Sequence, residues 1–154
     1  MDPIFKKLNF KEQAQILVLH APDSFQPHLE AMQELTSIHT QMEEVETIEF
    51  ALAFVTQKAE IGQIAPLLAE KANGDLLLWF AYPKKSSKNY QSDINRDDGW
   101  TVLGALGFEG VRQVAIDADW SALRFRKIEY IKKFTRRSSM AMTKEGKKRT
   151  TNKK

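Results

Sequence analysis

Apolar residues follow two alternating patterns along the chain. Three nearly continuous apolar runs, 14–19, 48–55 and 76–82, have the length and composition of buried strands. Between them, 24–35 and 58–71 carry apolar residues three or four positions apart, as on one face of a helix. The run at 76–82 is the most apolar, which predicts an inner strand of a parallel sheet that is covered on both faces.

The segment after residue 98 has a different pattern. A short helix is predicted over 99–106, and the next two segments, 111–117 and 121–127, alternate apolar and polar residues as a β-hairpin does. This order predicts a three-layer α/β fold with a mostly parallel sheet, Rossmann-like and of methyltransferase-like topology, closed by a C-terminal antiparallel hairpin. We expect a single α/β domain over 1–130 and a basic tail over 131–154.

Charge is distributed unequally between these two parts. Residues 132–154 contain ten lysines and arginines and one acid, a net charge of +9, whereas the preceding residues contain 13 bases and 19 acids, a net charge of −6. A segment so basic and so poor in apolar residues cannot offset the entropy of ordering it, so we expect a disordered tail. Its bases either bind nucleic acid without sequence preference or only keep the chain soluble. The candidate nucleic-acid residues are Lys132, Lys133, Arg136, Arg137, Lys147, Lys148 and Arg149.

Composition excludes several chemistries. The chain has no cysteine, which rules out disulfides, thiolate nucleophiles and cysteine-based metal centres. Its three histidines stand on separate predicted elements without metal-ligand spacing, so we expect no metal site. No apolar run approaches the roughly 20 residues of a membrane span, and the N-terminal residues lack the apolar run of a signal peptide. We therefore expect a cytoplasmic protein without a membrane partner.

The turns where cofactors bind lack the residues that such binding requires. A dinucleotide fold needs glycines after its first strand, so that the backbone can approach a phosphate, and the corresponding turn here, 20–25, has none. Neither a GxxxxGK[ST] phosphate loop nor a GxSxG nucleophile turn is present. We expect no cofactor, and whether the chain is an enzyme stays open. The aspartates Asp93, Asp97 and Asp98 either cap the helix that follows them or serve a metal or acid–base site.

A polar segment, 82–90, follows the predicted inner strand. Ligands of open α/β sheets bind beyond the carboxyl ends of the strands, and the lysines, hydroxyls and tyrosines here suit an anion such as a phosphate. The alternative is a solvated loop. Trp120 and Arg124 of the hairpin either line a pocket with this segment or only pack over the sheet edge. The candidate ligand-binding residues are Tyr82, Lys84, Lys85, Ser86, Ser87, Asp93, Trp120 and Arg124.

Short motifs in this region resemble those of a known family. They are a W-x-x-x-P-K motif (Trp79, Pro83, Lys84), an SDI motif (Ser92, Asp93, Ile94) and a D-W-S-x-x-R motif (Asp119, Trp120, Ser121, Arg124). Over about 50 residues, 74–125, the chain thereby resembles the bacterial DUF3052 family. The resemblance implies the α/β fold and the importance of these positions. It implies no activity, because the family is functionally uncharacterised.

Three functions compete on this basis. The first is a binding module whose basic tail adds nonspecific affinity for nucleic acid and other polyanions. The second is a degenerate methyltransferase-like enzyme that acts on a small anionic molecule held near Lys84. The third is an interaction module that pairs through the edge of the hairpin. The sequence leaves the ligand, the partner and the oligomeric state open.

Overall fold

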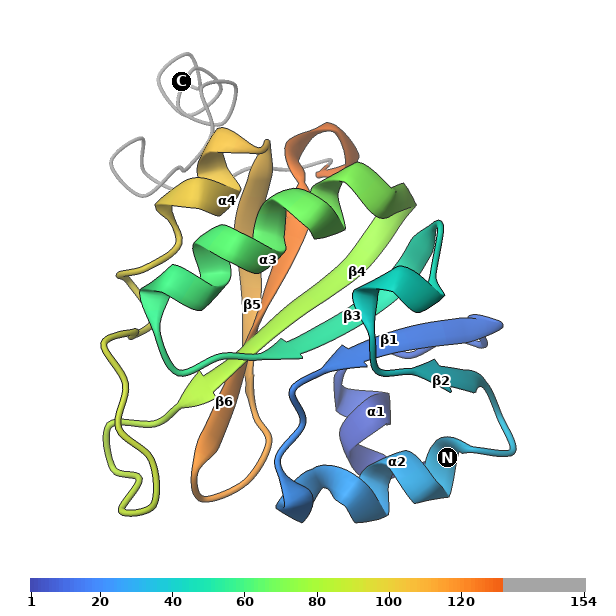
Figure 1. Ribbon diagram of the computed structural model, residues 1–154, viewed down its shortest axis with the longest axis horizontal. Helices are drawn as coiled ribbons and strands as arrows, with labels where there is room; N and C mark the ends of the chain where they lie inside the picture. The colour runs from blue at the N-terminus through green and yellow to red at the C-terminus, as the bar shows by residue number, and fades with distance from the viewer. Residues whose placement is uncertain (132–154) are drawn as a thin grey trace.

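Six strands form one mixed sheet in the computed structural model, which describes residues 1–131 (Figure 1). The strands are β1 Gln15–Leu19, β2 Ser37–His39, β3 Ile48–Phe54, β4 Ala72–Pro83, β5 Phe108–Ala115 and β6 Trp120–Lys127. The helices are α1 Pro3–Lys7, α2 Gln26–Met32, α3 Lys58–Lys71 and α4 Thr101–Ala105, with 3-10 turns at η1 Asp23–Phe25, η2 Met42–Glu44 and η3 Ile128–Tyr130. Residues 132–154, which hold the candidate nucleic-acid residues, lie outside the described part of the chain.

The strand order is β2-β1-β3-β4-β6-β5. The first four strands of this order run parallel, whereas β6 is antiparallel to β4 and β5 is antiparallel to β6. The predicted fold class is therefore confirmed, including the closing antiparallel hairpin. β4 is an inner strand, as its apolar run predicted, and it lies at the boundary between the parallel and the antiparallel part of the sheet.

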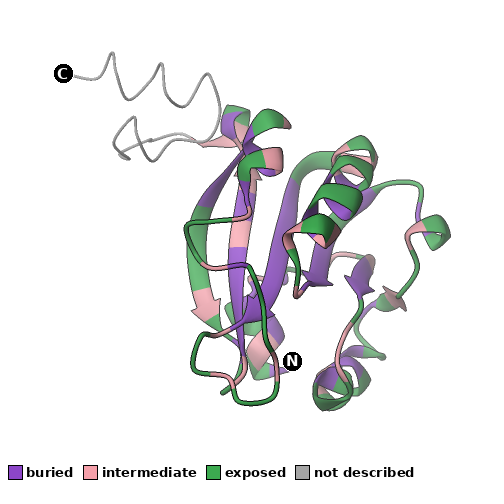
Figure 2. Ribbon diagram, turned by 60° about the vertical axis from the view of Figure 1, so that its left-hand side comes forward, coloured by how far each residue is buried: buried purple, intermediate pink, exposed green. Residues whose placement is uncertain are grey.

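Helices cover both faces of the sheet and complete three layers. On one face, Ile61 and Leu68 of α3 and Leu103 of α4 pack with strand residues such as Phe80 and Phe125. On the other face, α1 and α2 pack against the alternate residues of the same strands. Figure 2 shows the resulting burial of the central strands between exposed helix surfaces.

The N-terminal segment, for which the apolar pattern predicted no element, belongs to the second helical layer. α1 buries Phe5, and the next residue after its end, Leu8, is also fully buried and accepts a 2.9 Å hydrogen bond from the indole Nε1 of Trp79. Asp2 caps the first turn of α1, and its Oδ1 lies 2.8 Å from Nδ1 of His28 in α2. A helix of five residues is too short to show a helical period in sequence.

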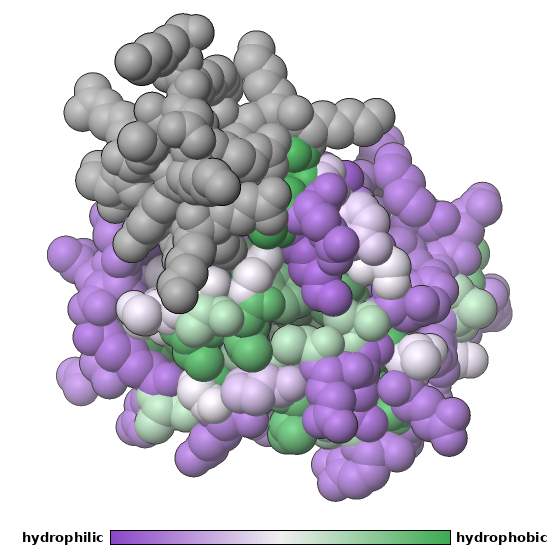
Figure 3. All heavy atoms as spheres, turned by 90° about the horizontal axis from the view of Figure 1, so that it is seen from above, coloured by the Kyte–Doolittle hydropathy of each residue, from purple (hydrophilic) through white to green (hydrophobic). Residues whose placement is uncertain are grey.

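None of the described helices is long and apolar enough to cross a bilayer. On the face of the molecule in Figure 3, hydrophilic side chains surround hydrophobic ones. Leu35, Leu67 and Val111 are among the large apolar side chains that the described part exposes, and they stand on separate segments: the turn before β2, α3 and β5. Single exposed apolar residues are common on folded domains and need no partner to explain them.

Candidate functional site

Two pockets open at the carboxyl edge of the parallel strands, and the ends of β4 and β6 divide them. Tyr82 pairs with Ser121, and Pro83 pairs with Trp120. Because successive strand residues point to opposite faces, Tyr82 belongs to the core on the α3 side and Trp120 to the core on the α2 side. We call the pocket at Tyr82 the basic pocket and the pocket at Trp120 the aromatic pocket.

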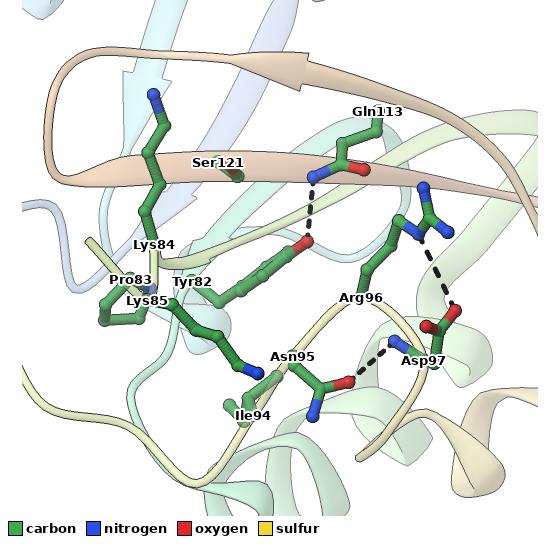
Figure 4. A pocket seen from close by; sticks show the side chains of 10 residues that line it. All are labelled: Tyr82, Pro83, Lys84, Lys85, Ile94, Asn95, Arg96, Asp97, Gln113 and Ser121. Carbon is green, nitrogen blue, oxygen red and sulfur yellow. Dashed lines mark hydrogen bonds and ion pairs between the residues drawn. The ribbon is translucent and has the colours of Figure 1, made fainter. Parts of the chain in front are cut away.

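The basic pocket has a volume of about 440 Å³. Its lining comes from the end of β4, from both ends of the loop between β4 and α4, and from the hairpin: Tyr82, Pro83, Lys84, Lys85, Ile94, Asn95, Arg96, Asp97, Gln113 and Ser121. Figure 4 shows Lys85 extending toward Asn95, with Arg96 on the side of Gln113. The lining thus contains three cationic residues and one carboxylate.

Hydroxyl groups lie between these cations. The Tyr82 hydroxyl accepts a 3.0 Å hydrogen bond from Nε2 of Gln113 (Figure 4). Burial raises the pKa of Tyr82 above its ordinary value, so the phenol stays protonated at neutral pH and keeps its own proton to donate. Arg96 Nε lies 3.6 Å from Oδ1 of Asp97, whereas Lys84 and Lys85 have no ion-pair partner among the described residues. The two lysines are therefore available to an anion.

Some candidate residues at the end of β4 and in the loop after it line the basic pocket, and one of them holds the loop in place. Tyr82, Lys84 and Lys85 line the basic pocket. Ser87 instead holds the loop, since its Oγ donates a 2.7 Å hydrogen bond to Oδ1 of Asp119 in the hairpin turn. Ser86 is exposed and is part of neither pocket lining.

Two of the three aspartates before α4, Asp93 and Asp98, bond to α3, a different helix from the one expected. Asp93 Oδ1 accepts a 2.8 Å hydrogen bond from the backbone N–H of Lys58 in the first turn of α3, and Asp98 accepts a 2.6 Å bond from the Lys58 ammonium. The expected cap of α4 is wrong, because the N-cap of that helix, Trp100, makes no side-chain capping bond. The described residues also contain no cluster of three or more histidines and acids that could hold a metal ion.

Trp120 and Arg124 lie on the same face of β6, away from the basic pocket. Trp120 lines the aromatic pocket and meets the loop through Tyr90, with ring centres 4.8 Å apart. Arg124 is further from the edge, is half-buried, and is part of neither pocket lining.

Arg96 and Gln113 are residues of the basic pocket that the sequence did not identify. Arg96 stands among acids and polar residues, and only the return of the loop to the edge of the sheet brings it into the lining of the pocket that Lys85 also lines.

The aromatic pocket has a volume of about 410 Å³ and lies where β1 and β3 end. Its lining is His20, Ala21, Pro22, Asp23, Ser24, Phe54, Thr56, Glu60, Tyr90 and Trp120. Because β2 and β3 lie on opposite sides of β1, this is the topological switch point of the sheet, where ligands of open α/β sheets bind.

Comparisons with known proteins identify the fold. No family model matches the chain, and no curated protein sequence matches it. Among solved structures, a SAM dependent methyltransferase from Aquifex aeolicus matches with a TM-score of 0.56 and 13% identity, over 81% of this chain and 88% of that one. Magnesium protoporphyrin IX methyltransferase from Synechocystis PCC 6803 matches with a TM-score of 0.51 and 12% identity, over 80% of this chain and 74% of that one. The chain therefore has the Rossmann-like fold of methyltransferases, and identities this low show the fold alone.

That fold implies S-adenosylmethionine as a cofactor, but the residues at the switch point do not fit it. The turn after β1 contains no glycine, and His20 itself takes a φ of 57°, a conformation that glycine adopts without strain. An acid after the second strand is needed to hold the hydroxyls of a ribose. Here Glu44 is engaged in capping η2, where it accepts a 2.9 Å bond from the N–H of Gln41. No residue from the end of β2 is part of the pocket lining.

Proposed function

We propose that this chain is a binding domain on a methyltransferase-type fold, and that its basic pocket takes a small anionic molecule. The observation that carries the proposal is the charge around the pocket, where Lys84, Lys85 and Arg96 face one carboxylate, that of Asp97. The lysines have no ion-pair partner among the described residues, so an anion would be their main electrostatic partner.

The lining suits a phosphate or carboxylate group. Ammonium and guanidinium groups form charge-assisted hydrogen bonds to such oxygens, and these bonds are roughly twice as strong as neutral ones. The hydroxyls of Tyr82 and Ser121 add neutral donors at the sheet. A group with several oxygens could therefore contact the loop and the sheet at once.

Binding is favoured over the alternative, a methyltransferase-like enzyme that acts on the same anion. The pocket lining contains no histidine, and its one acid, Asp97, is exposed beside Arg96. Neither pocket hydroxyl therefore has a general base beside it. The poor fit of S-adenosylmethionine at the switch point removes the donor that such an enzyme would need.

Isothermal titration calorimetry with inorganic phosphate, pyrophosphate and citrate tests the proposal. We expect at least one of these anions to bind, and we expect Lys85→Ala and Arg96→Ala each to weaken binding about tenfold, as a lost charge-assisted bond does. Lys88→Ala is the matched control, because Lys88 is an exposed lysine of the same loop outside the pocket lining. Absence of binding by all three anions, or an equal loss in the control, would overturn the proposal.

A second candidate function is nonspecific binding of nucleic acid, which the hairpin favours. Arg124 is half-buried, and its pKa is lowered first by burial and then by Arg126, with Asp75 opposing the shift and Arg112 adding a smaller lowering. Asp75 lies 2.6 Å from Arg126, whereas Nε of Arg124 has no partner among the described residues. The hairpin that carries these arginines is followed closely in the sequence by residues 132–154, which have a net charge of +9. Such charge favours phosphate backbones through counterion release.

We also propose kinship with the DUF3052 family on the motifs quoted above. Two of these motifs meet in the fold, because Pro83 pairs with Trp120 and the N–H of Lys84 donates a 2.7 Å hydrogen bond to the carbonyl of Asp119. Motifs that are about 35 residues apart and in contact are expected if they maintain one site.

A further inference from the structure

We propose that the aromatic pocket is a second ligand site and that it takes a small organic cation, such as a quaternary ammonium. This site is separate from the basic pocket of the proposed function. The two pockets differ in charge, since the lining of the aromatic pocket holds two carboxylates, Asp23 and Glu60, and neither lysine nor arginine. An anion would be repelled there, and a cation would be attracted.

Three aromatic rings provide the second part of the argument. The ring of Trp120 meets Phe54 edge-on, at 5.1 Å and 81°, and meets Tyr90 at 4.8 Å and 55°. Rings set at such angles form a corner rather than a flat stack. A cation within about 6 Å of an aromatic face is attracted by the ring quadrupole, and tryptophan is the best partner.

The indole N–H of Trp120 is not explained by the packing of its ring. Trp120 is 3% exposed, and its indole Nε1 is buried without an acceptor among the described residues. A buried donor without a partner costs stability, a cost that phenylalanine, although smaller, would not carry. Trp120 also lines the pocket, so a cation there would meet part of a large, electron-rich ring.

Glu60 lines the aromatic pocket and also caps α3. Its Oε1 accepts hydrogen bonds from the N–H groups of Thr56 and Gln57, at 2.9 and 3.1 Å. Its Oε2 lies 3.9 Å from Nδ1 of His20, on the turn that lines the same pocket. The capping bonds fix the carboxylate in place, so the site is pre-organised for a cation.

The position of the pocket agrees with this chemistry. It lies at the switch point of the sheet, but its lining offers carboxylates and rings in place of the glycine backbone that a phosphate needs. The chain has thus kept the location of a ligand site and changed the class of molecule that the site suits.

Titration of the full chain with choline, followed by tryptophan fluorescence and calorimetry, tests the inference. We expect choline to bind at least tenfold more tightly than 3,3-dimethyl-1-butanol, which has the same shape and no charge. Trp120→Phe should weaken choline binding severalfold, and the double variant Asp23→Asn with Glu60→Gln should weaken it at least tenfold. Glutamine can still accept the capping bonds, so the helix start is preserved.

Lys85→Ala is the control variant, because it alters only the basic pocket and should leave choline binding unchanged. Equal binding of choline and its neutral analogue, no binding of either, or unchanged binding in the double variant would overturn the inference. A variant counts only if its circular dichroism and thermal melt match those of the parent. If Trp120→Phe does not fold, the double variant decides the question. Loss of phosphate binding with choline binding intact would reject only the proposed function.

Discussion

Ser87 and Asp119 join the loop after β4 to the turn of the hairpin, through a 2.7 Å hydrogen bond from the serine Oγ to the aspartate Oδ1. Asp119 also accepts a 2.7 Å bond at its carbonyl from the N–H of Lys84. On one side of Ser87 in the loop, Lys84 lines the basic pocket, and on the other side, Tyr90 lines the aromatic pocket. Contacts between these two turns thus position residues of both pockets.

Ser87→Ala is expected to destabilise the fold and to weaken anion binding. Removing a hydrogen bond to a charged group at a half-buried site costs about 1 kcal/mol, and the loop that carries Lys84 and Lys85 loses one of its bonds to Asp119. Urea unfolding and phosphate titration measure the two effects. Ser86→Ala is the control, since Ser86 is exposed and outside both linings. Equal stability of the two variants would show that the contact contributes nothing.

Much of the fold could be predicted because its signals are local. The apolar run of β4 and the helical period of α3 lie within single segments, and both elements are where the sequence placed them, although β4 begins earlier than its apolar run. The hairpin was equally visible in its alternation. α1 was missed because five residues show no period, and its stability depends on contacts such as the bond from Trp79 to the Leu8 carbonyl.

The sequence predicted only those residues of the candidate site that directly follow a strand along the chain. Lys84 and Lys85 come directly after a strand end, which is a local signal for a ligand site. Arg96 reaches the same pocket only because the loop returns across the sheet edge, which no local pattern encodes. The same return brings Asp93 to Lys58, which is 35 residues earlier in the chain. Asp93 therefore caps α3, and the prediction that it caps α4 was wrong.

Tyr82→Phe is expected to change how stability depends on alkaline pH. Burial raises the pKa of Tyr82 in the folded chain above its unfolded value of about 10. The folded state therefore holds this proton more firmly, and stability falls as the pH rises past the unfolded pKa. The phenylalanine variant lacks this loss, so its free energy of unfolding should fall less between pH 9 and pH 11, to be scanned by urea unfolding.

The control for that scan is Tyr130→Phe, which removes a tyrosine outside the pocket linings. At neutral pH the Tyr82 variant should be slightly less stable than the parent, because Gln113 loses its acceptor. Parallel pH curves for the parent and Tyr82→Phe would contradict the assignment of a buried, protonated phenol at the sheet.

Asp98→Asn is expected to reduce the sensitivity of the fold to acid. The hydrogen bond from Lys58 lowers the pKa of the Asp98 carboxyl below its ordinary value. The stabilisation from this pair is present above the unfolded pKa and is lost as the pH falls through the folded pKa. The asparagine variant should lose less stability between pH 5 and pH 2.5, with Asp97→Asn as the control on the neighbouring exposed carboxylate. Because the pair is exposed, the difference should shrink in 1 M salt.

Deletion of residues 132–154 tests the second candidate function. The full chain should bind a short DNA or RNA duplex without sequence preference, and the affinity should fall at least tenfold between 50 and 200 mM salt. The shortened chain should bind at least tenfold more weakly, because its remaining residues have a net charge of −6. A full-length variant in which serine replaces the ten lysines and arginines of residues 132–154 keeps the length and removes the positive charge. If charge is the cause, this variant should bind as weakly as the shortened chain. Salt-independent binding would point to base contacts instead.

S-adenosylhomocysteine should not raise the melting temperature of the chain, although the fold is that of methyltransferases. Binding to the native state stabilises by mass action, so a ligand at a hundred times its dissociation constant would add about 2.7 kcal/mol. The turn at His20 and the end of β2 lack the groups that would hold its adenosine. This compound has no sulfonium, so it lacks the permanently charged onium group that the cation site inferred at Trp120 would bind. A saturable shift that Trp120→Phe abolishes would show that adenosine enters the aromatic pocket, and the judgement that the nucleoside does not fit would then be wrong.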